Sequence, residues 1–461
     1  MARELSIVGA GLAGALIARL LAQRGWKIDL YERRADPRSG PAIGGRSINL
    51  ALSERGWNAL RMAGLEQQVA AQAIAMRGRA VHSLDGHLDL QPYGLNDQQV
   101  IHSVHRANLN RLLVSAAADA GVRLHFDHAL RTVDWENSHL YLDTPQGPSQ
   151  QPFAAVVGAD GAGSPLRAAM IAAFGLEEEI SWEEHGYKEL SIRPGGTSQD
   201  PQFRLDPHAL HIWPRGQFML IALPNADRSF TVTLFLPLKG EKSFDKLTTE
   251  EAVAQFFQSE FPSAVPYLED LQQEFVDNQV GPLATLRLSP WHHQGRALLI
   301  GDAAHAVVPF HGQGMNCAFE DCAELADLLC DECDLAPAFA EFYRRRKDNA
   351  DAIAAMAVEN YYEMRDHVAR ADYQWAKQIE SALARRFPQR FLSRYAQVSF
   401  TRLPYAEARH RGAIQSEIIQ QLAQASSLEE IDWQLAEQLI AQRLQPLPSH
   451  AQLLNQESGH G

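Results

Sequence analysis

Apolar residues near the start of the chain change from the pattern of a strand to that of a helix and back again. Residues 5–8 form a short apolar run that is typical of a buried strand. Residues 15–24 place leucine and isoleucine at helical spacing, and Gly25 ends the predicted helix. A second strand is predicted over residues 27–31, directly before Glu32. The pattern therefore predicts a strand–helix–strand unit at the N-terminus.

The pattern changes further along the chain. A helix and then several strands keep the α/β character, over residues 108–121, 122–126, 139–143, 153–160 and 296–302. Between the last two strands, residues 217–223 and 230–236 are strand-like and are joined by the turn-forming sequence Pro-Asn-Ala-Asp-Arg-Ser. This hairpin signal predicts an antiparallel sheet in the middle of the chain. The last third predicts helices.

The second hairpin strand has two different faces, because alternate side chains of a strand point to opposite sides of the sheet. One face is entirely apolar and consists of Phe230, Val232, Leu234 and Leu236. We expect this face to join the core. Phe235 shares the other face with Thr231 and Thr233, where an aromatic side chain could line a cavity.

One predicted helix of the last third carries a stripe of residues at spacings of three and four. The stripe consists of Ile353, Met356, Ala357, Asn360, Tyr361, Met364 and Val368. Asn360 interrupts its apolar character, and a polar group on a buried face needs a hydrogen-bond partner. The spacing leaves two interpretations equally open: a local hydrogen-bond network, or contact with a ligand.

The composition favours a large folded protein that has no electrostatic attraction to nucleic acid. The chain has 461 residues, of which 46% are hydrophobic, so a substantial core can form. Its 42 basic and 56 acidic residues give a net charge of -14, without a long basic run. No apolar stretch reaches the ~18 residues of a membrane span. We expect no nucleic-acid partner and no membrane partner, and a flexible polar tail over residues 446–461.

All four cysteines lie in one short segment, as Cys317, Cys322, Cys330 and Cys333. The spacing of the last two is compatible with a metal or redox pair, but no histidine or second close pair completes a ligand set. The segment from residue 316 to 333 predicts a helix, in which cysteine is a common small buried residue. We therefore interpret the cysteines as structural, expect no metal site, and take free thiols to indicate the cytoplasm.

A glycine-rich turn follows the first strand and opens the first helix. Gly9, Gly11 and Gly14 have the spacing Gly-x-Gly-x-x-Gly, and Glu32 ends the next strand. Glycines allow a tight turn and the close approach of a pyrophosphate, while the helix N-terminus offers free N–H groups. The acidic side chain can accept hydrogen bonds from a ribose. The arrangement indicates a dinucleotide site without deciding between FAD and NAD.

Two later motifs separate these cofactors. Residues 158–167 contain an Asp-Gly-x-x-Ser-x-x-Arg pattern that begins at Asp160, and residues 297–302 form an apolar run that ends in Gly-Asp at Asp302. With the N-terminal glycines, this set resembles the class A flavoprotein aromatic hydroxylases, the family of p-hydroxybenzoate hydroxylase. The resemblance implies that Asp302 binds the ribityl chain of FAD and that Asp160 serves both FAD and the nicotinamide cofactor.

The residues after Asp302 agree with a flavin at this place. A helix N-terminus near Gly314 can stabilise negative charge on a reduced flavin. Gly312 and Gly314 do not begin a second complete glycine motif, because Cys317 stands at the third position. A separate nicotinamide domain is therefore not expected, as in the class A family.

Several longer segments resemble one subfamily, the kynurenine 3-monooxygenases. They lie in order between residues 5 and about 410, and they include residues 46–56, 77–79, 90–94, 185–190, 309–316, 359–361 and 402–405. The eukaryotic members carry a C-terminal membrane anchor, and this chain ends without an apolar span, so we expect the soluble, bacterial-type form.

The resemblance implies an α/β fold like that of p-hydroxybenzoate hydroxylase. A Rossmann-like FAD-binding domain would be combined with a central antiparallel-sheet substrate domain and a C-terminal helical region. The expected bounds are 1–80, 100–180 and 290–345 for the FAD-binding domain, 81–99 and 181–289 for the substrate domain, and 346–445 for the helical region.

The resemblance also implies roles for individual residues. Arg79 matches an arginine that pairs with the substrate carboxylate, which suits the geometry of a guanidinium group. The residues implied to bind the substrate are Arg79, Tyr93, Phe235, Phe310, Asn360, Glu363, Met364 and Tyr395. No side chain is implied with certainty as an acid or base, and Pro309 and His311 are expected near the flavin. Without the resemblance, a surface charge at Arg79 or a core position at Phe235 would be the simpler interpretation.

A larger set is implied to bind the cofactor. It consists of Gly9, Gly11, Leu12, Gly14, Glu32, Arg33, Arg34, Arg46, Leu52, Arg106, Leu130, Asp160, Asp302, Gln313, Gly314, Met315 and Asn316. Of these, only the glycines, Glu32, Asp302 and the region of Gly314 have a physical argument of their own.

The implied reaction is the hydroxylation of L-kynurenine to 3-hydroxykynurenine with FAD, NADPH and O2. NADPH would reduce the flavin, and O2 would add to it to give a C4a-hydroperoxide, whose terminal oxygen attacks the ring. The aromatic amine of kynurenine activates the carbon ortho to it, so no metal is needed. The protein would orient the ring, exclude water and keep the hydroperoxide protonated.

Competing functions predict different sequences. A hydroxylase of another aromatic acid would share the FAD motifs but lack the set of Arg79, Tyr93, Asn360 and Tyr395. A flavin halogenase would carry a Trp-x-Trp-x-Ile-Pro motif, which the sequence does not contain. A non-catalytic flavin-binding module that acts through partner proteins would not need to retain residues 312–316 or the polar set.

Overall fold

The computed structural model describes residues 3–40, 49–329, 334–367 and 370–448. This part of the chain forms two compact units, each assembled from three separate stretches. Unit 1 comprises residues 1–73, 104–183 and 283–357, and unit 2 comprises residues 74–103, 184–282 and 358–461. Among the residues so described, no helix has both the length and the apolar character needed to cross a membrane.

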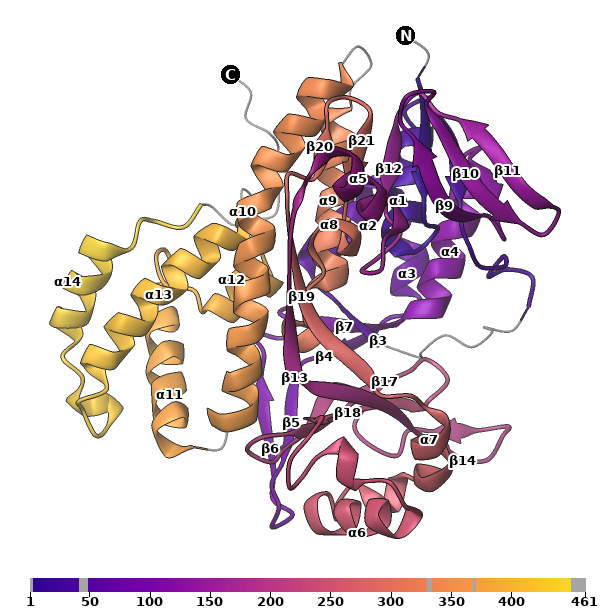
Figure 1. Cartoon of the computed structure of the whole chain (residues 1–461). Helices are drawn as coiled ribbons and strands as arrows, with labels where there is room; N and C mark the ends of the chain where they lie inside the picture. Colours follow the sequence, from indigo (N-terminus) through magenta and orange to yellow (C-terminus); the bar gives the residue numbers. More distant parts are fainter. Residues whose placement is uncertain (1–2, 41–48, 330–333, 368–369, 449–461) are drawn as a thin grey trace. The chain divides into compact units, whose positions relative to one another are not determined.

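The described residues of unit 1 contain a six-stranded sheet with the order β20–β21–β12–β1–β2–β8, of which Figure 1 labels β20, β21 and β12. In that order the strands span His292–His293, Ala297–Leu299, Val156–Gly158, Glu4–Val8, Lys27–Tyr31 and Arg123–His125. Neighbours from β21 to β8 run parallel, and β20 is antiparallel to β21. Parallel strands are usually covered on both faces, and Ile7, Ile28 and Val157 are accordingly buried.

Helix α1 (Leu12–Ala22) connects β1 to β2, so the predicted strand–helix–strand unit is confirmed. It begins earlier than the predicted residues 15–24, because the glycine turn already contains the first helical residues. The other helices of unit 1 are α2 (Glu54–Met62), α3 (Glu66–Ala70), α4 (Arg106–Asp119), α5 (Pro165–Phe174), α8 (Asp302–His305), α9 (Gly314–Leu328) and most of α10 (Leu335–Tyr362). Helix α4 and strand β8 confirm the elements predicted over residues 108–126.

A smaller antiparallel sheet in unit 1 consists of β9 (Ala129–Asp134), β10 (His139–Thr144) and β11 (Gly147–Pro152). Two predicted strands are shorter than expected. The strand predicted over residues 153–160 is limited to β12, and the one predicted over residues 296–302 is limited to β21. Both end early because the chain turns into the loop of Asp160 and into α8, which begins at Asp302.

Helix α9 confirms the helix predicted for the cysteine-containing segment, although it begins at Gly314 and ends at Leu328. Cys317 and Cys322 are free and buried, and burial raises the pKa of both thiols well above its usual range. Such thiols are unreactive, which agrees with a structural role. Cys330 and Cys333 lie outside the described residues.

The main sheet of unit 2 has the order β13–β18–β17–β16–β5–β6, and β19 (Gly281–Ser289) continues it beside β13 (Figure 1). The first six strands span Glu177–Ile192, Phe230–Pro237, Met219–Pro224, Ala209–Pro214, Gly78–His82 and Leu88–Pro92. From β13 to β6 the neighbours are antiparallel, except that β16 and β5 run parallel. The predicted hairpin is β17–β18 and is confirmed.

Strand β18 is covered on both faces. Its apolar face, with Phe230 and Leu234, packs in one cluster with Phe257 of α6 (Glu250–Glu260) and Phe275 of α7 (Leu271–Asp277). The predicted core face is thereby confirmed. Phe235 on the opposite face is also buried, and its ring centre lies 6.3 Å from that of Tyr187 on β13.

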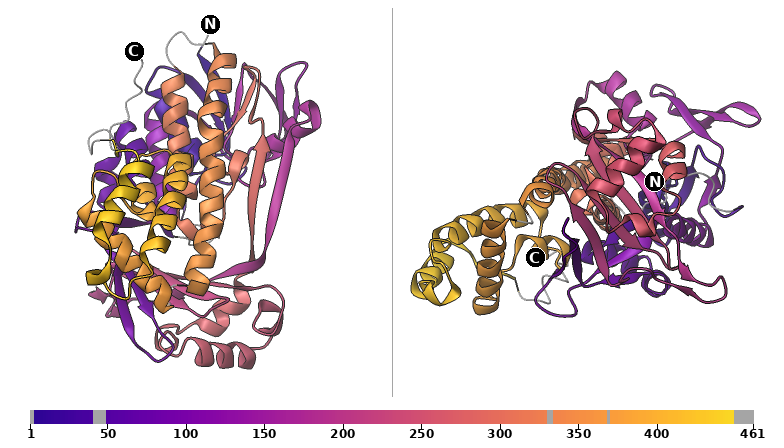
Figure 2. Two further views of the ribbon diagram at one scale, coloured as in Figure 1. Left: turned by 90° about the vertical axis from the view of Figure 1, so that its left-hand side faces the viewer. Right: turned by 90° about the horizontal axis from the view of Figure 1, so that it is seen from below.

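The end of unit 2 is helical, as predicted (Figure 2). A π-helix (Glu363–His367) follows α10, and the later helices are α11 (Ala371–Arg386), α12 (Arg394–Ser399), α13 (Tyr405–Leu422) and α14 (Trp433–Arg443). Helices α11, α13 and α14 lie side by side and share a core of their own, which includes Leu383, Ile418 and Ile440.

The predicted stripe on α10 is buried from Ile353 to Met364. Its last member, Val368, lies outside the described residues, as do residues 449–461 of the predicted tail. The shorter elements are β3 (Asn49–Leu52), β4 (Ile74–Met76), β7 (Ile101–His105), β14 (Gly195–Gly196), β15 (Pro201–Gln202) and the 3-10 turns Phe244–Lys246, Val265–Tyr267, Pro309–His311 and Leu428–Glu430.

Candidate cofactor and substrate sites

The three glycines of the first turn in unit 1 have different surroundings. A Cβ atom at Gly9 would lie 2.6 Å from the carbonyl oxygen of Ala159, and a Cβ atom at Gly14 would lie 1.8 Å from that of Gly9. A Cβ atom at Gly11 would meet nothing within 4 Å. Gly9 and Gly14 are therefore required by the packing of the turn, whereas Gly11 faces open space through which a ligand can approach. Leu12 begins α1 directly after it.

Glu32 is held in place at the end of β2 by backbone amides. One carboxylate oxygen accepts a hydrogen bond from the N–H of Ala10 at 2.8 Å, and the other accepts from the N–H of Arg34 at 3.0 Å. Asn110 of α4 donates to the carbonyl of Ala10 at 2.9 Å and fixes the same turn from the other side. Glu32, the residue predicted to bind a ribose, thus lies beside the glycine turn. The side chains of Arg33 and Arg34 are exposed.

Asp160 presents one unused acceptor next to this turn. Its Oδ2 atom accepts a hydrogen bond from the N–H of Leu166 at 3.1 Å, but its Oδ1 atom is buried and has no partner among the described residues. Burial raises the pKa of the carboxyl above its usual value, and hydrogen bonds from Ser164 and Leu166 only partly offset this effect. A buried acceptor without a partner is rare in folded proteins, so a hydroxyl group of a bound dinucleotide fits this position.

Arg167, which belongs to the same motif, connects two of the predicted cofactor segments. It is buried, and its guanidinium group donates to the carbonyl of Ala162 at 2.6 Å and to that of Ala303 at 3.0 Å. Its Nε atom donates to Glu178 at 2.6 Å. The loop of Asp160 is therefore fixed to the turn that carries Asp302, and Asp302 itself is exposed at the start of α8.

The segment before α9 packs against the end of β3. Asn316 accepts a hydrogen bond from the N–H of Ser53 at 2.9 Å and donates to the carbonyl groups of Ala51 at 2.7 Å and Gly312 at 3.0 Å. Gln313 accepts a hydrogen bond from the hydroxyl of Ser53 at 3.4 Å. Because α9 begins at Gly314, its first N–H groups are available to a ligand.

The structure thus brings together most of the predicted cofactor set within unit 1. Leu52 is buried beside Asn316, since a Cβ atom at the neighbouring Gly56 would meet both side chains. Met315 is half-buried, Leu130 is buried on β9, and Arg106 is exposed at the first residue of α4. Phe310 and His311 are buried in a 3-10 turn whose first residue, Pro309, is exposed. Arg46 lies outside the described residues.

Unit 2 holds a separate polar cluster that contains the predicted carboxylate-binding residues. Arg79 lies on β5, Tyr93 follows β6, and Tyr395 lies on α12. The two tyrosine rings are stacked, with centres 5.3 Å apart and planes inclined by 16°. The guanidinium carbon of Arg79 lies 5.7 Å from the ring centre of Tyr93 and 5.1 Å from that of Tyr395. Cation–π contacts of this kind hold the guanidinium group close to both rings.

The charge and hydrogen-bonding capacity of this cluster suit an anion. Burial lowers the pKa of Arg79, but Tyr395, Tyr93 and Glu363 outweigh burial and raise it above its usual value. Burial also raises the pKa of both tyrosine hydroxyls, which therefore remain protonated donors. The Nε atom of Arg79 is buried and has no partner among the described residues. An anion that accepts from Arg79 would satisfy this donor.

Glu363 provides a negative charge near the same arginine. It lies on the π-helix, accepts a hydrogen bond from the hydroxyl of Tyr373 at 2.5 Å, and has Arg394 at 3.6 Å and Lys377 at 3.7 Å. Burial raises the pKa of its carboxyl, but the surrounding cations and Tyr373 outweigh burial and lower it. Tyr373 and Lys377 were not among the predicted residues, although their spacing of four residues on α11 places both on one helix face.

Asn360 and Met364 lie on the buried stripe of unit 2, and each is about 5% exposed or less. The side-chain amide of Asn360 lies 3.1 Å from the sulfur of Met364. A local partner for Asn360 therefore exists, and its contact with a ligand stays a prediction. Phe235 is buried in the same unit.

Known proteins resemble the chain at the level of the family. The sequence profile of the family described as FAD binding domain matches residues 3–336, which is more than half of the chain. A solved structure of 2-methyl-3-hydroxypyridine-5-carboxylic acid oxygenase has a TM-score of 0.64 at 20% identity, and covers 81% of this chain and 95% of its own. The solved structure of PqsL from P. aeruginosa, in complex with 2-aminobenzoylacetate, has a TM-score of 0.63 at 22% identity. It covers 79% of this chain and 96% of its own. The fold is thus that of a flavoprotein hydroxylase, as predicted.

Sequence relatives are considerably closer. A kynurenine 3-monooxygenase of Stenotrophomonas maltophilia is 49% identical over 461 residues, which cover 99% of each chain. One from Xanthomonas axonopodis pv. citri is 50% identical over 450 residues, which cover 96% of this chain and 98% of the relative. The chain therefore belongs to the FAD-binding domain family and, within it, to the family of bacterial kynurenine 3-monooxygenases.

Proposed function

We propose that this protein hydroxylates L-kynurenine to 3-hydroxykynurenine, with FAD as its cofactor and with NADPH and O2 as co-substrates. The observation that carries the proposal is the cluster of Arg79, Tyr93 and Tyr395. It occurs in a chain that is 49% identical to a kynurenine 3-monooxygenase over almost its full length. NADPH is proposed as the reductant on the strength of the family alone.

FAD would lie along the cofactor site of unit 1. Gly11 gives the pyrophosphate access to the turn, Glu32 accepts from the adenosine ribose, and Asp160 and Asp302 accept from hydroxyl groups of the cofactor. Bound FAD would supply the redox chemistry by which one oxygen atom of O2 is transferred to the substrate, with NADPH as the reductant. The N-terminus of α9 stabilises the negative charge of the reduced cofactor.

The amino-acid end of kynurenine would bind in unit 2. Its carboxylate accepts hydrogen bonds from Arg79 and from the hydroxyls of Tyr93 and Tyr395, which are all protonated at neutral pH. Glu363 and Asn360 complete the polar side of this site. The aromatic ring packs against Phe235 and Met364 of the same unit, and these apolar groups exclude water from the reacting carbon.

The proposed reaction does not require a strong acid or base from the protein. The amine of the substrate donates electron density to its ring and makes the ortho carbon nucleophilic, so the protein has to orient the ring rather than ionise it. His311 is buried beside Phe310 and is proposed to lie near the flavin without a fixed acid–base role.

The free, buried Cys317 and Cys322 suit a reducing compartment, and we propose that the protein acts in the cytoplasm.

The test is NADPH oxidation by the FAD-loaded protein with and without L-kynurenine, with the product identified by mass and by comparison with 3-hydroxykynurenine. The proposal requires strong stimulation and a product heavier by one oxygen atom. Anthranilate, which has the aromatic amine but not the amino-acid side chain, is the matched control. Stimulation by L-kynurenine with release of peroxide only would identify kynurenine as an effector and another aromatic acid as the substrate. No stimulation would reject kynurenine altogether.

A further inference from the structure

A buried ionic network lies next to the turn of Gly301 and Asp302 in unit 1, and the proposed function does not use it. It consists of Arg55, His305, Glu320, Asp321 and Arg346. Glu320 pairs with Arg55 and, at 2.5 Å, with Arg346, whose Nε atom donates to Asp321 at 2.8 Å. The side chains of Arg55 and Asp321 are 0% exposed. Charges buried this deeply persist only when they are paired, so each member fixes its neighbours.

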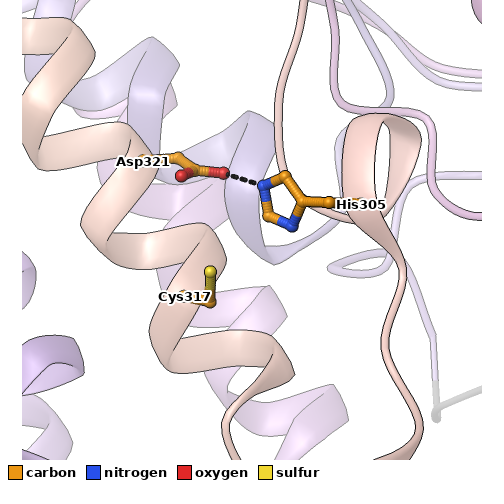
Figure 3. Close-up of side chains that lie close together, drawn as sticks. All are labelled: His305, Cys317 and Asp321. Carbon is orange, nitrogen blue, oxygen red and sulfur yellow. Dashed lines mark hydrogen bonds and ion pairs between the residues drawn. The ribbon is translucent and has the colours of Figure 1, made fainter. Parts of the chain in front are cut away.

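Asp321 connects this network to the backbone. Its Oδ2 atom accepts hydrogen bonds from the N–H of Gly301 at 2.9 Å and from Nε2 of His305 at 2.7 Å, and Figure 3 shows the second of these contacts. Burial raises the pKa of the Asp321 carboxyl, but His305 and Arg346 outweigh burial and hold it below its usual range. The Gly301 amide therefore donates its hydrogen bond to an ionised carboxylate, that of Asp321.

A metal ion is the obvious alternative occupant of this place. Ligand atoms of His305, Cys317 and Asp321 all lie within 4.8 Å of one another (Figure 3). However, Arg346 already donates to Asp321 at 2.8 Å and lies 3.4 Å from the sulfur of Cys317. A cation at this place would have to displace the guanidinium group. Burial also raises the pKa of the Cys317 thiol, so the thiolate that a metal needs is not formed. The cluster binds Arg346 instead.

The turn that receives this network has an unusual backbone. Gly301 has φ 56° and ψ -143°, a conformation that side chains rarely allow. A Cβ atom here would lie 3.1 Å from that of Ala318 on α9. Because Asp302 is the next residue and the first of α8, the orientation of the Gly301 peptide sets the direction of the Asp302 carboxylate.

We propose that Asp321 is a positioning residue for the flavin: it holds the Gly301–Asp302 turn, through the Gly301 amide, in the orientation that FAD requires. The same network reaches two other predicted flavin segments. Arg55 lies on α2, two residues after Ser53 and three after Leu52, and Glu320 and Asp321 lie on α9, which begins at Gly314. The inference rests on the proposed function only in placing FAD against Asp302, and it is independent of the substrate.

The experiment compares Asp321→Asn with Glu320→Gln. Each change removes one negative charge from the same buried network, but only Asp321 contacts the Gly301 amide. An asparagine at position 321 cannot accept from both Arg346 and Gly301, because one of its two polar atoms is a donor. We expect Asp321→Asn to weaken FAD binding at least about tenfold, as for a buried donor left without an acceptor. At saturating FAD, the visible spectrum and the midpoint potential of the bound flavin should also shift.

Glu320→Gln should lower the melting temperature of the FAD-free protein, while its FAD affinity, spectrum and potential change far less than those of Asp321→Asn, because Glu320 does not contact the Gly301 amide. Arg346→Lys serves as a milder second variant in case Asp321→Asn does not fold, since it keeps the charge but loses the fork that orients Asp321. It should shift the flavin spectrum in the same direction by a smaller amount. Equal flavin properties in the Asp321, Arg346 and Glu320 variants would overturn the proposal. Loss of kynurenine turnover with wild-type flavin properties in all three variants would contradict the positioning role of Asp321. Wild-type protein that binds FAD normally but does not turn over kynurenine would contradict the proposed function instead.

Discussion

In unit 1 the candidate cofactor site is made largely of backbone, whereas in unit 2 the candidate substrate site is made of side chains. A Cβ atom at Gly9 or Gly14 would strike the chain, and the absence of one at Gly11 leaves open space for the proposed cofactor. Arg79 and Tyr93 act through a charge and a hydroxyl group. A backbone site therefore fails when an atom is added, and a side-chain site loses affinity stepwise as groups are removed. The two sites call for opposite kinds of substitution.

The largest effect is expected within the glycine turn itself. Gly14→Ala places a Cβ atom 1.8 Å from the carbonyl oxygen of Gly9, so the turn has to open. Overpacking of this kind costs about 3 kcal/mol or more. We expect the FAD-free protein to lose that much stability in urea unfolding, and FAD binding to become undetectable by fluorescence titration. Gly11→Ala is the control, because Gly11 has φ -70° and open space around it. It should weaken FAD binding and leave the FAD-free protein as stable as the wild type; an equal loss of stability would contradict the distinction.

The charge at Arg79 should have the next largest effect. Arg79→Gln removes the cation that the proposed site offers to a carboxylate, at a cost of roughly 2–3 kcal/mol. The KM for L-kynurenine should rise roughly 100-fold in steady-state assays, with an unchanged affinity for FAD. Arg77→Gln, two residues earlier on an exposed position, should leave both quantities unaltered. Equal kinetics of the two variants would mean that the polar cluster is part of the fold of unit 2 and not a binding site.

A buried histidine in unit 2, His82, should also make the stability of the protein depend on pH. His82 is hydrogen-bonded to His211 at 2.9 Å, and burial, with the charges of His211 and Arg215, lowers the pKa of His82 to about 4. In the unfolded chain the pKa is near 6.5. Between these values the unfolded chain binds a proton that the folded chain does not, so stability falls as pH decreases from 6.5 to 4 and levels off below.

His82→Phe keeps the stacking on Trp213, whose ring centre lies 4.1 Å away, but removes the titrating group. The free energy of unfolding, measured by urea titration, should then decrease less between pH 6.5 and pH 4, by of order 1–3 kcal/mol. An unchanged pH dependence would show that His82 does not titrate differently in the folded and the unfolded chain.

The smallest effects are expected for the hydroxyl groups. Tyr93→Phe and Tyr395→Phe preserve the stacked rings, which lie 5.3 Å apart, and remove one donor each. Each should raise the KM for L-kynurenine by roughly fivefold, the effect of one hydrogen bond of about 1 kcal/mol. Their combined effect should be close to the product of the single effects. A loss of flavin affinity in either variant would contradict the assignment of these hydroxyl groups to the substrate site.

The same comparison explains what could be predicted from the sequence. The glycine turn, Glu32 and the Gly301–Asp302 pair are contiguous motifs, and their physical requirements are local, so strands β1 and β2 and helix α1 followed from the pattern. Asp321 and Arg346 have no such signature, because an ionic network becomes visible only when the helices that carry its members are packed together. The roles proposed for Arg79, Tyr93 and Tyr395 depended on the family resemblance, since each residue alone suits a surface or a core equally well.

The pattern of apolar residues also did not predict where the short strands end. Apolar residues continue past β21 to Ile300, but the chain leaves the sheet there because Gly301 adopts a positive φ and Asp302 starts a helix. The reverse holds for Phe235, which looked distinct from the core face of β18 and is nevertheless buried. Burial on the second face depends on other elements and cannot be inferred from alternation within one strand.

The division of both units into separate stretches has a consequence for synthesis on the ribosome. Unit 1 requires residues up to 357, and unit 2 requires residues 358–461 as well as 74–103. Strand β21 borders β12 in the parallel sheet, so the sheet of unit 1 has to wait for a strand that emerges long after β1 and β2. Contacts between segments so distant in sequence form slowly. The nascent chain therefore exposes incomplete apolar surfaces for most of its translation, and neither unit corresponds to a continuous fragment that could be expressed by itself.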